Sequence, residues 1–200
     1  VDDAMEYVDK LNEVDNKYAV SVDQLSNSIR KAGGTANAFG VSMDMVIGYT
    51  TAIGEATRES GQQIGNSLKT IFSRVTTLGG AEKVLNAVGI AVKDQAGEAR
   101  RAEDIFNDLH KVWGDLTNAE RQNIALKVAG THQVNRFLVM MQNYDKALKA
   151  AGTAEKSWGS AARENAKYME SIQAKLNNLW SSLQLVAVAA GDAGLTKAFK

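Results

Sequence analysis

The sequence contains no cysteine and no proline. Without cysteine, a disulfide scaffold, a thiol nucleophile and any cysteine-ligated metal site are excluded. Proline ordinarily supplies about 5% of a chain and breaks the hydrogen bonding inside a helix, so its absence favours long helices. The 17 glycines are then the main candidates for helix breaks.

Net charge and long apolar runs are also absent. Lys and Arg together number 23, and so do Asp and Glu, so no overall field attracts nucleic acid or an anionic membrane. No apolar run approaches the ~20 residues that span a bilayer, and the N-terminus lacks the features of a signal peptide. Because the chain begins with Val1, we expect that it is a piece of a longer protein.

Motifs for catalysis, nucleotide binding and metal binding are missing as well. The sequence has no GxGxxG, GxxxxGK[ST], GxSxG or HExxH motif and no EF-hand spacing. Of the two histidines, His110 and His132, the first lies close to Asp108 and Asp115 in sequence. A metal site needs at least three converging ligands, so we favour a hydrogen-bonded surface histidine. We expect no metal and no cofactor.

Four carboxylates are close together in the sequence, with two arginines among them. They are Glu98, Glu103, Asp104 and Asp108. Paired carboxylates perform acid–base catalysis when burial raises the pKa of one of them. Acidic residues in a first turn also suit the helix dipole, so we favour a solvated helix start and expect no catalytic residue and no enzymatic activity.

Basic residues come closest to forming a patch in the last third of the chain. They are Lys146, Lys149, Lys156, Arg163 and Lys167. Asp145, Glu155 and Glu164 lie next to or between them, which favours charged outer faces of helices over nucleic-acid binding.

Amphipathic helix patterns fill most of the sequence. In residues 38–80, two such patterns meet at a polar break and carry these apolar residues: Met43, Val46, Ile47 and Ile53 in the first, and Ile64, Leu68, Ile71, Phe72 and Val75 in the second. Ser42 is placed to cap the first, and Gly79-Gly80 to end the second. Other helices are expected over residues 1–18, 81–88, 102–113 and 118–129, and one from near 131 to about 150.

Two capping boxes mark helix starts. Ser21 with Gln24, and Thr117 with Glu120, have the spacing at which side chains and backbone N–H groups satisfy each other. Heptad-like spacing continues from Val22 to Ile53, and we expect two helices there with a break at Gly40-Val41. Residues 90–101 combine β-leaning and turn residues, which predicts a small β-hairpin.

The last segment has the most regular pattern. From Trp158 to Ala190, positions that are apolar except for Asn165 recur at steps of four and three, which predicts a long helix with a coiled-coil-like seam. We predict partner contacts along this seam, with its packing on the chain's own helices as an equal alternative. The seam residues are Met169, Ile172, Leu176, Leu179 and Leu183. The fold class is therefore all-α, with seven or eight helices and one hairpin. A compact domain is expected over residues 1–152 and the long helix over 153–200.

Several stretches also form an ordered set. They are Gly40-Val41-Ser42, the Gly61-Gln62 break, residues 67–74 (SLKTIFSR), 89–97, 104–113, 120–124, 129–137 (AGTHQVNRF), Asn143-Tyr144 and 177–185. This order resembles the core region of phage tail tape-measure proteins over roughly residues 20 to 190. The chain departs from the family after the long helix, where a Gly-x-x-Leu-x-Pro stretch is usual and no proline occurs here.

The resemblance implies a virion structural protein of a phage or prophage-derived tail. Such proteins lie inside the tail tube, are assembled in the host bacterial cytoplasm, set tail length and leave ahead of the DNA at ejection. Implied partners are tail tube proteins, tail-tip or baseplate proteins and tail assembly chaperones, with homo-oligomerisation through the terminal helix. Two alternatives stay open: a muralytic or peptidase domain of a tail protein, and a secreted helical effector module.

Overall fold

The computed structural model describes the backbone of residues 2–77 and 79–198, and the side chains of residues 5–77 and 79–181. This part of the chain contains ten helices and no strand, so the all-α class is confirmed, although the helices outnumber the expected seven or eight. In chain order they are α1 (Asp2–Lys17), α2 (Val22–Ala38), α3 (Met43–Thr57), α4 (Gly61–Thr77), α5 (Gly79–Ala87), α6 (Ala102–Trp113), α7 (Asn118–Ala129), α8 (Val134–Gln142), α9 (Tyr144–Glu155) and α10 (Ser160–Ala198).

Both predicted capping boxes are confirmed. The Gln24 N–H donates to Ser21 Oγ at 3.2 Å, and the Ser21 N–H donates to Gln24 Oε1 at 3.0 Å. Thr117 and Glu120 repeat this exchange at the start of α7. Ser60 and Gln63 form a third box before α4, which the sequence analysis did not single out. Local side-chain chemistry thus determines three helix starts.

The expected break between α2 and α3 is also confirmed. Gly40 has a φ of 69°, a left-handed conformation that favours glycine and turns the chain out of α2. Ser42 Oγ then accepts the Met45 N–H at 3.3 Å and caps α3.

The single helix expected from near residue 131 to about 150 was a wrong prediction. The chain forms α8 and α9 instead, with Asn143 between them at a φ of −109°. Both the backbone N–H and the side-chain amide of Asn143 donate to the carbonyl of Val139, at 3.0 and 2.9 Å. This local bonding by an Asn side chain offers the backbone an alternative to continued helix.

The predicted hairpin at residues 90–101 is reduced to a turn with a single antiparallel bridge, between Lys93 and Ala99. Asp94 holds the turn because its carboxylate accepts the backbone N–H groups of Ala96 and Glu98, each at 2.9 Å. Ile90 and Val92 anchor the segment in the core, where they are 3% and 2% exposed.

Large aromatic side chains form the centre of the core. Tyr49, Phe72, Phe106, Phe137 and Tyr144 are all fully buried and come from five different helices. Their ring centroids are about 6 Å apart in successive pairs, in the tilted and edge-on arrangements that aromatic rings prefer. The two tyrosine hydroxyls lie 2.9 Å apart, and Tyr144 donates onward to Asn107 Oδ1. Burial raises the pKa of both tyrosines, so this buried pair stays neutral.

Glycines allow two pairs of helices to pack unusually closely. A Cβ at Gly61 would lie 2.0 Å from the Gln24 carbonyl oxygen, and one at Gly65 would lie 2.6 Å from that of Ser28. Gly48 on α3 meets the Ala147 carbonyl of α9 in the same way. Because these distances leave no room for a side chain, glycine is required where α2 crosses α4 and where α3 crosses α9.

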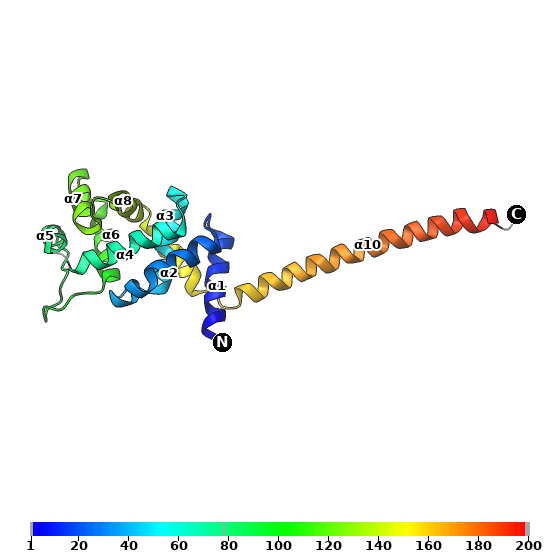
Figure 1. The fold of residues 1–200 in the computed structure, drawn as a ribbon, viewed down its shortest axis with the longest axis horizontal. Helices are drawn as coiled ribbons and strands as arrows, with labels where there is room; N and C mark the ends of the chain where they lie inside the picture. Colours follow the sequence, from blue (N-terminus) through cyan, green and yellow to red (C-terminus); the bar gives the residue numbers. More distant parts are fainter. Residues whose placement is uncertain (1, 78, 199–200) are drawn as a thin grey trace. The chain divides into compact units, whose positions relative to one another are not determined.

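The chain forms two compact units, Val1–Trp158 and Gly159–Lys200. Within the first, α5 and α7 lie at the end opposite α1 (Figure 1). The second consists of α10, one continuous helix of 39 residues (Figure 1). The expected domain division after residue 152 would cut through α9, which continues to Glu155.

Candidate functional site

A bidentate ion pair joins two parts of the chain that are 77 residues apart. Arg136, in the first turn of α8, donates to both carboxylate oxygens of Glu59, at 2.6 and 2.8 Å. Glu59 lies in the turn between α3 and α4, and both side chains are largely buried. The hydrogen bonds to Glu59 raise the pKa of Arg136, so its guanidinium stays charged.

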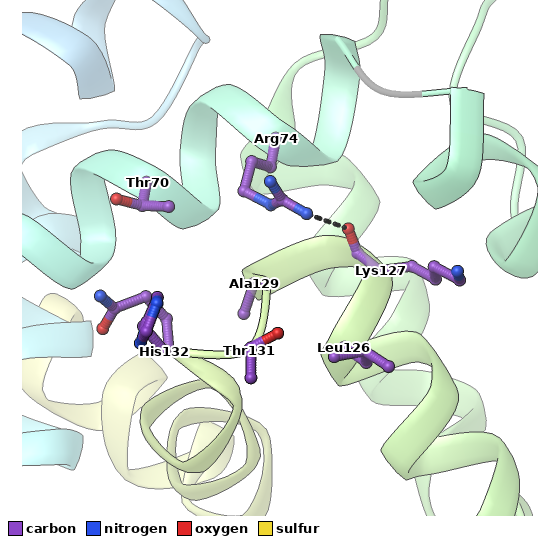
Figure 2. Close-up of a pocket in the computed structure, with 9 residues that line it drawn as sticks. Thr70, Arg74, Leu126, Lys127, Ala129, Thr131 and His132 are labelled. Carbon is purple, nitrogen blue, oxygen red and sulfur yellow. Dashed lines mark hydrogen bonds between the residues drawn. The ribbon is translucent and has the colours of Figure 1, made fainter.

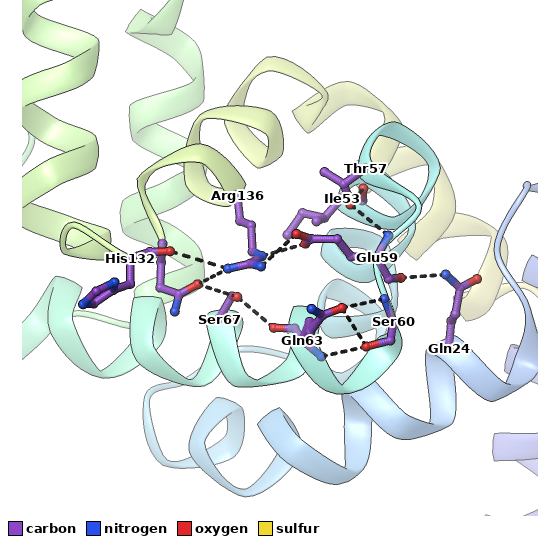
Figure 3. Close-up of polar contacts among 10 residues, drawn as sticks. Gln24, Ile53, Thr57, Glu59, Ser60, Gln63, Ser67, His132 and Arg136 are labelled. Carbon is purple, nitrogen blue, oxygen red and sulfur yellow. Dashed lines mark hydrogen bonds and ion pairs between the residues drawn. The ribbon is translucent and has the colours of Figure 1, made fainter.

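Further hydrogen bonds extend this pair into a network (Figure 3). Arg136 also donates to Gln133 Oε1 at 2.8 Å, and the Ser67 hydroxyl of α4 donates to the same oxygen at 2.6 Å. From α2, the Gln24 side chain donates to the Glu59 carbonyl at 2.8 Å. The network therefore fixes α2, α4, α8 and the α3–α4 turn relative to one another.

The network brings together two stretches that are far apart in sequence. Glu59 lies just before the Gly61-Gln62 break, and Ser67 lies in the helix after it. Gln133 and Arg136 belong to residues 129–137. Both stretches are part of the ordered set of motifs described above. Their polar residues hold the helices together here.

Beside this network lies a pocket of about 500 Å³, between α4 and the α7–α8 connection (Figure 2). Its lining residues are Thr70, Arg74, Leu126, Lys127, Ala129, Gly130, Thr131, His132 and Gln133. Three of these side chains are basic and none is acidic. Gln133 belongs to both the pocket and the network.

Arg74 is the most constrained side chain of the pocket. One of its terminal nitrogens donates to the Lys127 carbonyl at 3.3 Å, whereas its buried Nε has no hydrogen-bond partner. Gly130 packs against the guanidinium, since a Cβ there would lie 3.2 Å from Arg74 Cζ. Gly130 also has a φ of 75°, so a side chain at this position is disfavoured twice.

His110 is a hydrogen-bonded surface histidine, as expected. Its Nε2 lies 3.0 Å from Asp145 Oδ1, and its ring stacks on Tyr144 at a centroid distance of 4.7 Å. Asp108, its neighbour in sequence, pairs with other residues. Among the described residues, no group of three or more histidines, cysteines and carboxylates is arranged to hold a metal ion.

Two of the four sequence-clustered carboxylates have separate structural roles. Asp108 accepts from Lys111 at 2.8 Å and from Arg100 at 2.7 Å, and these bonds lower the pKa of its carboxyl group. Glu103 accepts the backbone N–H of Ser42 at 2.7 Å and so ties α6 to the start of α3. These partners favour ion pairing and capping for Asp108 and Glu103.

The basic residues singled out from the sequence do not form one patch within the first unit. Lys146 pairs with Glu55 at 2.6 Å. Lys149 and Lys156 line a separate pocket with Lys17, which itself pairs with Glu13. Arg163 and Lys167 belong to α10, where Lys167 pairs with Glu164.

The seam residues lie on α10, and most are exposed. Met169 is 56%, Leu176 45% and Leu179 55% exposed, whereas Ile172 is half-buried. The side chain of Leu183 lies outside the described residues. Two aromatic residues absent from the predicted seam, Tyr168 and Trp180, are exposed on the same helix, so its apolar surface is larger than the periodicity indicated.

Sequence reasoning missed the network and the pocket. Glu59, Arg74 and Arg136 carry no periodic signal, and their partners lie 53 to 77 residues away. The only available signal was the ordered set of motifs, which contains Arg74 and Arg136 but assigns them no role.

A protein-family comparison identifies a relationship. The family model described as phage-related minor tail protein matches residues 1–130, more than half of the chain. No solved structure matches the chain. Within the described residues, no helix is both long enough and apolar enough to cross a membrane. This family has a structural role in the phage tail, where it contacts other tail proteins of the virion. The chain belongs to the phage-related minor tail protein family.

Proposed function

We propose that the chain is part of a tape-measure protein, which acts in tail assembly, tail-length determination and genome ejection through protein–protein contacts. The family match over residues 1–130 carries the proposal, because it assigns the compact unit to the phage tail. The ordered motifs and the absence of proline support the more specific tape-measure role. The proposed location is the lumen of the tail tube, with tube, tail-tip or baseplate proteins and assembly chaperones as partners.

Helical geometry gives this function a physical basis. A helix converts chain length into distance at ~1.5 Å per residue, so an extended helical protein can measure a tail. The 39 residues of α10 correspond to roughly 58 Å. Residues 1–158 form a compact unit, so their number does not translate into a distance along the tail. We therefore assign the length-setting role to extended helical parts of the protein.

The full-length reading frame tests this assignment. A protein with many hundreds of predominantly helical residues, of which this chain is one part, would agree with a tape measure. A complete protein of 200 residues would contradict it, because it would be too short to span a tail.

We further propose that the seam of α10 makes the partner contacts. Exposed Met169, Leu176 and Leu179 leave a continuous apolar stripe on a long helix, and such stripes are typically covered by another helix. A second copy of this chain is the occupant we favour, because the heptad spacing suits a like helix. In the alternative arrangement, the seam packs on the chain's own helices.

Two double substitutions separate these arrangements. Replacing Leu176 and Leu179 by Glu puts charge in the seam, whereas replacing Ala174 and Ser181 by Glu puts the same charge on the opposite face of α10. Sedimentation should give an oligomer for the wild type and the Ala174/Ser181 variant, and a monomer for the Leu176/Leu179 variant. A monomeric wild type would contradict self-association through the seam.

Muralytic activity requires a separate experiment. A peptidoglycan zymogram on the chain should show no clearing, because Glu103 is bound to a helix N-terminus and Asp108 to two cations. Clearing that is lost when Glu98 or Glu103 is mutated would show muralytic activity and would overturn the proposed structural function of the chain. Membership of a phage tail family gives no support to the secreted-effector alternative.

A further inference from the structure

We propose that the pocket between α4 and the α7–α8 connection is an anion site that receives a carboxylate group from a partner tail protein. The proposal goes beyond the tape-measure assignment and does not depend on it. It rests on the hydrogen-bond donors that converge on the pocket, on the charges around it and on the apolar residue at its rim.

The first observation is the incomplete bonding of Arg74. A guanidinium has five N–H donors in a planar fork that matches a carboxylate. Arg74 uses one terminal nitrogen, for the Lys127 carbonyl, and its Nε is buried without an acceptor. Because Gly130 covers the Nε, an incoming anion would form its charge-assisted hydrogen bonds with the terminal nitrogens of Arg74.

The second observation is the turn that follows Gly130. Within the described part of the chain, the backbone N–H groups of Thr131 and His132 have no acceptor, although the Gln133 N–H bonds to the Gly130 carbonyl. Two successive N–H groups without an acceptor in this turn are available to hydrogen-bond an anion. Thr131 and Arg74 both line the pocket that Figure 2 shows.

The charges around the pocket point in the same direction. Arg74, Lys127 and His132 contribute to its lining, which contains no carboxylate. Glu59, the acidic residue of the adjacent network, already accepts two hydrogen bonds from Arg136. A carboxylate in the pocket would therefore interact mainly with Arg74 and Lys127, for which the described part of the chain shows no ion-pair partner.

The geometry favours a protein carboxylate over nucleic acid. Duplex DNA carries one charge per ~1.7 Å and is bound by an extended row of cations. Here the donors line one pocket, and its lining includes Leu126, which is 42% exposed. A partner segment with an apolar side chain next to a carboxylate group would contact both Leu126 and the hydrogen-bond donors of the pocket. Either the C-terminus or an acidic side chain of a partner could supply this carboxylate.

Amide NMR on the full chain tests the site. The probes are N-acetyl-leucine, which mimics a C-terminus, and N-acetyl-glutamate amide, which presents a side-chain carboxylate. The expected result is a saturable shift of the Thr131 and His132 amides and of Arg74 Nε–H with at least one probe, and the stronger one identifies the source. N-acetyl-leucinamide, which has no carboxylate, should shift none of them.

Substitution of Arg74 links the shifts to the pocket. Arg74→Gln should weaken binding about tenfold or more, because it removes charge-assisted hydrogen bonds. The control is Arg30→Gln, which removes an exposed arginine of α2 and should leave binding unchanged. Thr131→Val provides a milder variant of the pocket if Arg74→Gln does not fold, and it should weaken binding by a smaller factor.

Three results would overturn the proposal. The first is the absence of saturable shifts with either carboxylate in the wild type, and the second is an equal response to N-acetyl-leucinamide. The third is that a short DNA duplex shifts the same amides with higher affinity than the carboxylates do, in a salt-dependent way. The ligand of the pocket would then be nucleic acid and not a partner protein.

Discussion

At the scale of single residues, close helix packing depends on the absence of a side chain. Gly65 of α4 and Gly34 of α2 are both helical glycines, yet their surroundings differ. A Cβ at Gly65 would lie 2.6 Å from the Ser28 carbonyl oxygen, whereas a Cβ at Gly34 would have nothing within 4 Å. Both glycines lie in amphipathic helical patterns, and the structure shows which of them faces the backbone of another helix.

Alanine substitutions at these positions should therefore have opposite effects. Gly65→Ala should lower the free energy of unfolding by about 2 kcal/mol, because α2 and α4 must move apart. Gly34→Ala should raise it by about 0.5–1 kcal/mol, because alanine restricts the unfolded chain and favours the helix. Urea denaturation of both variants measures this, and the same sign for both would contradict the packing described.

Asp108 makes a contribution to stability that depends on pH. Its hydrogen bonds with Lys111 and Arg100 lower the pKa of its carboxyl group in the folded state. A lowered pKa means that the contribution is complete above the unfolded value of about 3.9 and is lost as pH falls through the folded value. Because Asp108 is one-third exposed, the contribution should be about 0.5–1 kcal/mol.

Asp108→Asn tests this contribution. At pH 7 the variant should be less stable than the wild type, and the difference should shrink as pH falls below about 4. Asp115→Asn makes the same change in charge at a residue without an ion pair in the described part of the chain, and serves as the control. A difference for Asp108→Asn that is constant from pH 7 to acid would show that the ion pairs do not cause it.

At the scale of elements, helix starts that depend on residues a few positions apart were predicted from the sequence better than features that depend on packing. The capping boxes at Ser21 and Thr117 were predictable because their partners lie three residues away. The break at Asn143 was missed because the apolar stripe of α8 continues into α9 across it. The hairpin was over-predicted, since β-leaning residues at 90–92 pack into the core with only one bridge.

The candidate site was less predictable than the helices. No pattern in one sequence reveals that Glu59 lies opposite Arg136, because the two residues become neighbours only when α8 packs beside the α3–α4 turn. The same holds for Arg74 and Gly130. In contrast, the α10 seam was predicted directly from its periodicity, although Tyr168 and Trp180 broaden it.

The Glu59–Arg136 pair should contribute more than an ordinary surface pair, because it is bidentate and about three-quarters buried. A double-mutant cycle with alanine at both positions should give a coupling energy of about 1 kcal/mol or more. The exposed Lys167–Glu164 pair of α10 is the control and should give about 0.2–0.5 kcal/mol. Equal coupling energies for the two pairs would contradict a special role for the network.

At the scale of the whole molecule, the two units suit two different tasks. The first unit has a continuous core with buried aromatic residues from five helices, so its size depends little on chain length. The second is a single helix with an apolar stripe, and its length increases with every residue added. The tape-measure proposal therefore concerns the extended helical parts of the protein and not the compact unit.

Tail length, measured by electron microscopy, tests the central claim most directly. In-frame insertion of four heptads into an extended helical part of the full-length protein, in a phage that carries it, should lengthen the tail by roughly 42 Å at ~1.5 Å per residue. An equal deletion should shorten the tail by the same amount. Tails of unchanged length, assembled normally with both variants, would contradict a tape-measure function.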